Sequence, residues 1–407
     1  MNNRILVVED SRSFRNYLNN QISQINMEVV STESLKEAKA ILENDTDFLC
    51  AVLDFCLPDG PDGEVIDLAL SYDMKVIVVT GQFDEQLRDA MLEKGVIDYI
   101  LKDSFASISY LLPLLTRLNR NKCHKALVVD DSLTVRRHLV QLLDHHYIRS
   151  VQAEDGVEAL EILKGDPEIT LIITDNIMPE KDGISMTREI RLTYDRSQLA
   201  ILGISTAESK TVTAQFLKAG ANDYLKKPFN QEEFYCRIQN LLNMKDISDD
   251  MFKMANQDAL TGLWNRRYLF SNADNNKEQR NVAMLDIDFF KRINDNYGHE
   301  GGDQALVTIS HIIAIYFKED LAARFGGEEF CIVNYGDYDA FVQRLDSMRQ
   351  RIEKTAIAYN GEDIKLTMSI GVTRAKRDID TMIRIADERL YTAKESGRNR
   401  VISEDLN

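Results

Sequence analysis

The sequence predicts the α/β fold class, with two doubly wound parallel-sheet domains followed by a third α/β domain. Three observations lead to this prediction. An apolar run followed by two acidic residues and a serine occurs at residues 5–11 and again at residues 126–132. After each copy, strand patterns alternate with helix patterns, which is typical of a parallel sheet. The last part of the chain combines an apolar strand with a Gly-Gly hairpin, and carboxylates follow both.

The repeated motif sets the order of elements in the first two domains. Residues 5–11 read Ile-Leu-Val-Val-Glu-Asp-Ser, and residues 126–132 read Ala-Leu-Val-Val-Asp-Asp-Ser. A second apolar strand ends in Asp54 in the first copy and in Asp175 in the second, at the same distance from the acid pair. We therefore expect two domains with the same topology.

Two further strands in each copy end in residues that suit phosphate chemistry. The third strand ends in Thr80 or Thr206, and the fourth ends in Lys102 or Lys227. The carboxyl ends of parallel strands form one edge of a sheet, so these side chains are expected beside the acids. Clustered carboxylates bind Mg²⁺, and the metal and lysine together let one aspartate accept a phosphoryl group.

Both copies resemble CheY-like receiver domains. The resemblance implies that a cognate histidine kinase or phosphotransfer protein phosphorylates Asp54 and Asp175. The implied Mg²⁺ ligands are Asp10, Asp54, Cys56, Asp131, Asp175 and Ile177. The implied switch residues are Thr80, Tyr99, Lys102, Thr206, Tyr224 and Lys227. Structural adaptors with silent sites, and tyrosines that merely lie in the core, are the alternatives.

The two copies differ in detail. The second has Lys227-Pro228, as most receivers do, whereas the first has Lys102-Asp103 and Glu9 as its first acid. The missing proline leaves the geometry of the last loop in the first copy open, but not its phosphorylation site.

The third domain has two acidic features. An apolar strand at residues 282–285 leads into Asp286, and the motif Gly-Gly-Glu-Glu at residues 326–329 lies between two apolar runs. The second feature predicts a β-hairpin with acids at its tip. Glycines there let a phosphate and a metal approach the backbone, while the acids supply oxygen ligands.

Residues 258–400 resemble a GGDEF domain, the nucleotidyl cyclase-like module of diguanylate cyclases. The hairpin, an opening motif at 258–267, Ser-Ile-Gly at 369–371 and a closing motif at 386–399 occur in the family's order. The resemblance implies that two GTP become cyclic di-3′,5′-GMP and two pyrophosphates. Each domain would hold one GTP, so the reaction requires a homodimer. A catalytically silent nucleotide receptor and a phosphorylation-controlled scaffold are the alternatives.

The resemblance also implies roles for individual residues. Mg²⁺ is expected on the side chains of Asp286, Glu328 and Glu329 and on the carbonyl of Ile287. Glu328 is the expected general base for the 3′-hydroxyl, and Lys291 the expected stabiliser of phosphate charge. The expected substrate-binding residues are Phe289, Phe290, Lys291, Asn294, His299, Asp303, Lys394 and Arg398.

The order of two receivers and a GGDEF domain resembles the PleD-type response regulators, and we expect domains at residues 1–121, 122–245 and 246–407. A helical pattern over residues 231–257 joins the last two. It carries an apolar stripe made of Met244, Ile247, Met251 and Met254. The stripe predicts either a dimer seam or a helix face packed on its own domain. Asp246, Asp249 and Asp250 are expected on a solvated face.

Composition limits the partners. The formal net charge of −17 argues against binding to nucleic acid or an anionic membrane surface. No apolar run is long enough for a membrane-spanning helix, and the first residues lack a signal peptide pattern. The five cysteines lack metal-ligand spacing. They are expected to be reduced and mostly in the core, which favours a cytoplasmic protein without membrane insertion.

A last expectation concerns feedback by the product. Many GGDEF domains bind cyclic di-GMP at an Arg-x-x-Asp motif just before the hairpin. Here Asp320 is present, but Phe317 stands where the arginine would be. A phenyl ring cannot donate to a guanine edge or a phosphate, so the primary inhibitory site is expected to be absent.

Overall fold

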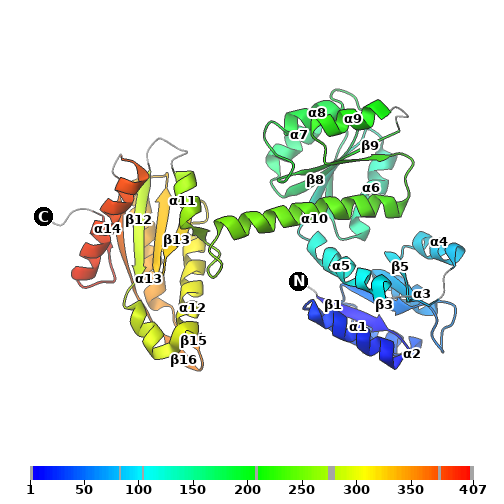
Figure 1. The fold of residues 1–407 in the computed structure, drawn as a ribbon, viewed down its shortest axis with the longest axis horizontal. Helices are drawn as coiled ribbons and strands as arrows, with labels where there is room; N and C mark the ends of the chain where they lie inside the picture. Colours follow the sequence, from blue (N-terminus) through cyan, green and yellow to red (C-terminus); the bar gives the residue numbers. More distant parts are fainter. Residues whose placement is uncertain are drawn as a thin grey trace. The chain divides into compact units, whose positions relative to one another are not determined.

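The computed structural model describes residues 3–81, 84–102, 105–206, 210–273, 280–374 and 377–403. The chain forms two compact units, Met1–Ser248 and Asp249–Asn407. The first unit contains two five-stranded sheets, and the second contains a six-stranded sheet and a small hairpin (Figure 1). This architecture confirms the predicted α/β class.

The first sheet has all strands parallel in the order β2-β1-β3-β4-β5. Its strands are β1 (Arg4–Val8), β2 (Glu28–Thr32), β3 (Cys50–Asp54), β4 (Val76–Thr80) and β5 (Asp98–Leu101). Helices on one face are α1 (Arg12–Gln24) and α5 (Phe105–Asn121), and those on the other are α2 (Leu35–Leu42), α3 (Glu64–Ser71) and α4 (Glu85–Glu93). Because both faces are covered, the central strands are continuous apolar runs.

The second sheet repeats this topology in the order β10-β9-β8-β6-β7. Its strands are β6 (Lys125–Val129), β7 (Arg149–Ala153), β8 (Ile169–Asp175), β9 (Ala200–Ser205) and β10 (Asp223–Lys226). Helices α6 (Leu133–His145) and α10 (Gln231–Asn256) cover one face, and α7 (Gly156–Gly165), α8 (Gly183–Ile190) and α9 (Lys210–Ala219) cover the other.

Helix α10 corrects one expectation. Asp246 does not lie on a solvated face, since its side chain is 15% exposed and accepts a hydrogen bond from Arg117 at 2.6 Å. Its other carboxylate oxygen lies 3.0 Å from Nε2 of His124. Burial would raise the pKa of Asp246, but His124 and Arg117 together lower it to about 2. The Asp246 carboxylate thus links the two receiver-like domains through Arg117 and His124 instead of facing water.

The apolar stripe on α10 faces solvent. The exposed fractions are 69% for Met244, 55% for Ile247, 65% for Met251 and 84% for Met254. Packing of this face on its own domain, one of the two expectations, is therefore wrong.

The cysteines require a second correction. Cys50 and Cys331 are buried, but Cys56, Cys123 and Cys236 are exposed, so most are not in the core. These three lie outside the apolar strands and helix faces that form the cores. Among the described residues, no helix has the length and apolar character needed to cross a bilayer.

The third sheet is mixed, with the order β11-β13-β14-β12-β17-β18. Its strands are β11 (Trp264–Asn265), β12 (Asn281–Ile287), β13 (Leu321–Gly326), β14 (Glu329–Asn334), β17 (Met368–Thr373) and β18 (Val401–Ile402). Helices α12 (Phe290–Tyr316) and α13 (Tyr338–Lys354) pack on one face, and α11 (Arg266–Ala273) and α14 (Ile379–Glu395) on the other. Strands β15 (Ile357–Tyr359) and β16 (Glu362–Ile364) form the small hairpin. The predicted hairpin around the Gly-Gly motif is confirmed as β13 and β14.

Candidate active site

The acidic residues of the third domain meet at one end of its sheet. In the antiparallel register, Asp286 at the end of β12 faces Glu329 at the start of β14. The backbone N–H of Ile287 donates to the carbonyl of Glu328 in the hairpin turn at 3.4 Å. Gly327 in this turn has a φ of +49°, a left-handed conformation that glycine adopts most readily. The hairpin therefore brings all four expected metal-binding residues to the end of β12.

Asp286 is the buried member of this group. Its carboxylate is 7% exposed and pairs with Nζ of Lys394, on α14, at 2.8 Å. Burial raises the pKa of Asp286 to about 6, against the lowering effect of Lys394 and with a further rise from Glu328 and Glu329. Three carboxylates and a carbonyl are hard oxygen donors of the kind that Mg²⁺ prefers, although the carboxylate oxygens of Asp286, Glu328 and Glu329 do not all lie within 4.8 Å of one another in the described structure. The donor set thus fits a metal of the Mg²⁺ type.

The expected phosphate-binding residues lie beside this group. Phe289 precedes α12 in a left-handed conformation, with φ of +56°. The guanidinium of Arg398 lies 4.3 Å from the centre of the Phe289 ring, and that of Arg292 lies 4.5 Å from it. Lys291 is exposed in the first turn of α12. The first turn of a helix offers unpaired N–H groups that suit phosphate oxygens.

The residues expected to bind guanine lie further along α12. The helix is interrupted at Gly298, and Asn294 precedes this break while His299 and Asp303 follow it. A Cβ at Gly302 would lie only 2.0 Å from Oδ1 of Asn294. Because Gly302 has no side chain, the Asn294 side chain can occupy its position without a clash. His299 and Asp303 are exposed, so both are accessible to a ligand.

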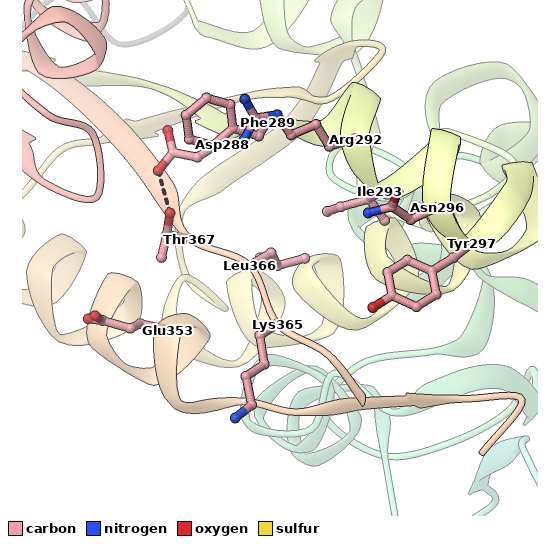
Figure 2. Close-up of a pocket in the computed structure, with 10 residues that line it drawn as sticks. All are labelled: Asp288, Phe289, Arg292, Ile293, Asn296, Tyr297, Glu353, Lys365, Leu366 and Thr367. Atoms are coloured by element: carbon pink, nitrogen blue, oxygen red, sulfur yellow. Dashed lines mark hydrogen bonds between the residues drawn. The ribbon is translucent and has the colours of Figure 1, made fainter. Parts of the chain in front are cut away.

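Figure 2 shows a cavity beside the first turns of α12. It has a volume of about 340 Å³ and is lined by Asp288, Phe289, Arg292, Ile293, Asn296, Tyr297, Glu353, Lys365, Leu366 and Thr367. Of the expected substrate-binding residues, only Phe289 lines it. The cavity thus adjoins the candidate site without containing its acids.

In the first receiver-like domain the expected cluster forms. Glu9, Asp10 and Asp54 place a carboxylate oxygen each within 4.8 Å of one another, and no other group of acids, histidines or cysteines in the described residues does so. Nζ of Lys102 lies 2.6 Å from both Glu9 and Asp54. Burial raises the pKa of Glu9, although Lys102 counteracts it. The backbone N–H of Cys56 donates to Asp54.

In the second receiver-like domain the lysine contacts are the same. Nζ of Lys227 lies 2.7 Å from Asp130 and 2.8 Å from Asp175. Burial lowers the pKa of Lys227, but the hydrogen bonds and the charges of Asp130 and Asp175 together raise it above its usual value. The backbone N–H of Ile177 donates to Asp175 at 2.7 Å. The exposed Asp131 lies outside any such three-membered set of the described residues.

The expected switch residues differ between the two receiver-like domains more than the lysine contacts do. Thr80 is buried and hydrogen-bonds the buried Tyr99. Thr206 is exposed, while Tyr224 is buried and donates to the carbonyl of Ser205 at 3.4 Å. The tyrosines thus lie in the core in this state, which was the simpler expectation, but only one of them reaches the threonine.

Sequence reasoning missed an arginine in each receiver-like domain. Arg15 on α1 donates to the carbonyls of Glu9 and Asp10, and Arg136 on α6 donates to those of Asp130 and Asp131. Both follow the acid pair at the same spacing, so the repeat itself was a signal for them. They fix the backbone from which the acidic side chains extend.

Comparison with known proteins assigns a family to each of the three domains. Residues 255–400 match the family model of the diguanylate cyclase GGDEF domain, and residues 5–108 and 126–239 match that of the response regulator receiver domain. The chain is 28% identical to the response regulator PleD of Caulobacter vibrioides over 99% of each chain. It is 34% identical to diguanylate cyclase A of Treponema denticola over 40% of this chain and 49% of that protein.

A solved structure gives the same assignment. A putative two-component system response regulator/GGDEF domain protein is 38% identical, with a TM-score of 0.56, and aligns over 60% of this chain and 99% of its own. The chain belongs to the PleD-type response regulators, which carry receiver domains and a GGDEF diguanylate cyclase domain.

Proposed function

We propose that this protein is an active diguanylate cyclase that condenses two GTP into cyclic di-3′,5′-GMP and two pyrophosphates under the control of phosphorylation. The observation that carries the proposal is the meeting of Asp286, Lys394 and the hairpin acids Glu328 and Glu329 at the end of β12. A domain that had lost catalysis would not need to keep a buried acid, its lysine and both hairpin acids.

The proposed chemistry uses groups of this chain. Glu328 accepts the proton of a 3′-hydroxyl whose oxygen bonds to the α-phosphorus of the second GTP, and the bond from that phosphorus to pyrophosphate breaks. Lys291, Lys394 and Arg398 stabilise the charge on the phosphates. Mg²⁺, held by Asp286, Glu328, Glu329 and the Ile287 carbonyl, would neutralise phosphate charge and favour deprotonation of the hydroxyl.

Substrate choice is proposed to come from α12. Asn294 and Asp303 would hydrogen-bond the guanine edge, with His299 nearby and the N–H groups of Phe289 and Phe290 near the phosphates. A carboxylate accepts from N1–H and the N2 amino group of guanine, which adenine cannot offer. This favours GTP over ATP.

Each catalytic domain would hold one GTP, so the product requires a homodimer. The exposed stripe formed by Met244, Ile247, Met251 and Met254 supports a dimer seam, because large apolar side chains exposed on one helix face suit pairing with a second copy. We also propose that the domains comprise residues 1–121, 122–245 and 246–407, so that the seam lies where the second receiver joins the catalytic domain.

Control is proposed to act through Asp54 and Asp175. Each lies beside a lysine and near further acids, the arrangement needed to accept a phosphoryl group from a histidine kinase or phosphotransfer protein. The remaining proposed metal ligands are Asp10, Cys56, Asp131 and Ile177, and the proposed switch residues are Thr80, Tyr99, Lys102, Thr206, Tyr224 and Lys227.

One assay tests the function. Purified full-length protein is incubated with GTP and Mg²⁺, and pyrophosphate and cyclic di-GMP are quantified, with ATP as the matched control substrate. We expect both products from GTP and none from ATP. Binding of GTP without pyrophosphate release would show a nucleotide receptor, and no binding at all would favour a scaffold.

A further inference from the structure

We infer that Asp288 is a positioning residue that holds Phe289 and Arg398 where they meet the substrate phosphates; the inference rests on the proposed function. Asp288 lies two residues after Asp286 and is 4% exposed. The chemistry proposed above gives it no role, although a buried carboxylate is costly unless its partners compensate for the lost water. Its partners indicate what it does.

The carboxylate of Asp288 accepts three hydrogen bonds. Oδ2 accepts from Oγ1 of Thr367 at 2.6 Å and from the backbone N–H of Asn399 at 3.1 Å. Oδ1 accepts from the hydroxyl of Ser369 at 2.6 Å. Figure 2 shows Asp288 directed towards Thr367, with Phe289 next to it. Both oxygens are thus engaged by neutral donors, whereas Asp286 is paired with a lysine.

The bond to Asn399 constrains an unusual loop. Gly397, Arg398 and Asn399 are all left-handed, with φ values of +111°, +63° and +47°. Such a conformation is unfavourable for most residues other than glycine, with asparagine more tolerant than the rest, and here surrounding contacts hold it. Asp288 holds Asn399 through its backbone, and Arg349 donates to the Asn399 side chain at 2.6 Å.

The left-handed loop at residues 397–399 contacts Phe289, the residue that follows Asp288. The Arg398 guanidinium lies 4.3 Å from the centre of the Phe289 ring. Phe289 is itself left-handed, at φ of +56°, and follows Asp288 directly. The backbone N–H of Asp288 donates to the carbonyl of Thr367 at 2.9 Å, which fixes the start of this turn. Asp288 therefore fixes Phe289 through the chain and Arg398 through Asn399.

This role predicts that shape matters and charge does not. In Asp288→Asn, the amide oxygen can still accept from Thr367 and Asn399, and the amide nitrogen can donate to the Ser369 hydroxyl. In Asp288→Ala, the loop loses its anchor. A metal ligand would show the opposite sensitivity, because an amide is a much poorer ligand than a carboxylate for a hard cation.

The test measures nucleotide affinity and turnover of the full chain. Affinity is measured by calorimetry with a GTP analogue whose α–β bridging oxygen is a methylene group, and KM and kcat are measured with GTP. We expect Asp288→Ala to weaken analogue binding and to raise KM about tenfold, with a smaller change in kcat. This is the usual effect of losing one charge-assisted contact, here the one between Arg398 and a substrate phosphate. Asp288→Asn is expected to stay within about twofold of the wild type.

A matched control and a double variant complete the test. Asp337→Ala removes a carboxylate that caps α13 by accepting from Ala340, and it is expected to lower stability without changing KM. In an Arg398→Ala background, Asp288→Ala is expected to weaken analogue binding little further, because both changes remove the same contact. If Asp288→Ala does not fold, Thr367→Val removes one donor and is expected to give a smaller rise in KM.

Three results would overturn the inference. They are an unchanged KM in the folded variants, equal losses in the Asn and Ala variants, or fully additive effects with Arg398→Ala. Analogue binding separates this question from the proposed function. A wild-type protein that makes no cyclic product but binds the analogue fails as a cyclase, while the comparison of binding still decides the role of Asp288.

Discussion

The receiver sites and the catalytic site both place a lysine against a buried carboxylate at the end of a strand, but they differ in how far they close. In the receivers the lysine lies between two buried acids, and Lys102 and Lys227 are each only 16% exposed. In the catalytic domain Lys394 is 31% exposed and contacts one buried acid, Asp286. We call the receiver sites closed and the site of the catalytic domain open.

The difference follows from what each site acts on. A receiver modifies its own aspartate, so the parallel sheet edge alone can supply the acids and the lysine. A site that is proposed to hold a nucleotide and to face a second catalytic domain needs open edges. These come from the hairpin turn at residues 326–329 and from the left-handed loop at residues 397–399. Strand ends thus supply the acids of the receiver sites, whereas the site of the catalytic domain combines a strand-end acid, Asp286, with groups on turns.

The largest expected effect is the loss of turnover when an acid of the open site in the catalytic domain is removed. Asp286→Ala or Glu328→Ala is expected to reduce cyclic di-GMP formation by about 100-fold or more, because each removes a proposed metal ligand. Turnover is measured by pyrophosphate release, and folding by circular dichroism. Asp363→Asn, an exposed acid on β16, is the matched control and is expected to be neutral. Near wild-type turnover in either alanine variant would show that the metal assignment is wrong.

The next effect concerns the closed sites. Beryllofluoride mimics an acyl phosphate, and we expect it to raise turnover severalfold and to favour the dimer, measured by light scattering. Asp54→Asn with Asp175→Asn is expected to abolish the response while basal turnover remains. An unchanged rate and oligomeric state of the wild-type protein would contradict control by the receivers.

The two receivers are also expected to differ from each other. Only the first brings three carboxylates within 4.8 Å among the described residues, so its metal set is the more complete. We therefore expect Asp54→Asn to remove more of the beryllofluoride response than Asp175→Asn. Equal losses in the two single variants would show that the geometry of the acids does not rank the sites.

The acids at strand ends were predictable from the sequence, because each one follows a continuous apolar run of the length of a buried strand. This holds for Asp54, Asp175 and Asp286, and the structure has all three at the ends of strands or one residue from them. The hairpin was predictable for the same reason, since a Gly-Gly pair between apolar runs specifies a turn.

Contacts between distant segments were not predictable. Asp246 has the pattern of a solvated helix position. It is covered because Arg117, 129 positions earlier in the first receiver-like domain, and His124, 122 positions earlier at the start of the second, both reach it. Asp288 gave no signal either, since its partner Asn399 lies 111 positions later. A single sequence shows which face a residue occupies on its own element, but not what packs against that face.

A smaller effect concerns the pH dependence of stability in the receiver unit. Burial lowers the pKa of His145 to about 4, helped by the charge of Lys75, and burial also holds the pKa of His146 well below its usual range. The unfolded chain binds protons below about pH 6.5, whereas the folded state does not until much lower pH. Stability is therefore full above pH 6.5 and falls as the pH drops towards 4.

We expect the receiver unit to lose about 2 kcal/mol of unfolding free energy between pH 7.5 and pH 5 from each of these histidines, or about 4 kcal/mol from the two. Urea unfolding followed by circular dichroism reports the whole chain, while the single tryptophan, Trp264, reports the catalytic domain. His145→Gln is expected to reduce the loss, and His138→Gln, an exposed position on the same helix, is the control. A loss that is the same in all three proteins would contradict the assignment.

The smallest expected effect is inhibition by the product, because the place where other family members bind it is already filled. Phe317 is 1% exposed and packs edge-on against Phe341 with ring centres 5.8 Å apart, so it is a core residue. Asp320 is engaged on both oxygens, by Arg344 on one and by Nδ2 of Asn334 at 2.6 Å on the other.

A guanine edge would have to displace one of these partners, without the arginine fork that usually compensates. We therefore expect micromolar cyclic di-GMP to change the initial rate by less than about twofold, since losing a charge-assisted contact weakens binding about ten- to a hundredfold. Progress curves with added product measure this. Strong noncompetitive inhibition that persists in Arg344→Ala would reveal a different site. If Arg344→Ala abolishes it, Arg344 has taken over from the missing arginine, and control would then lie in the open catalytic domain as well as in the closed receivers.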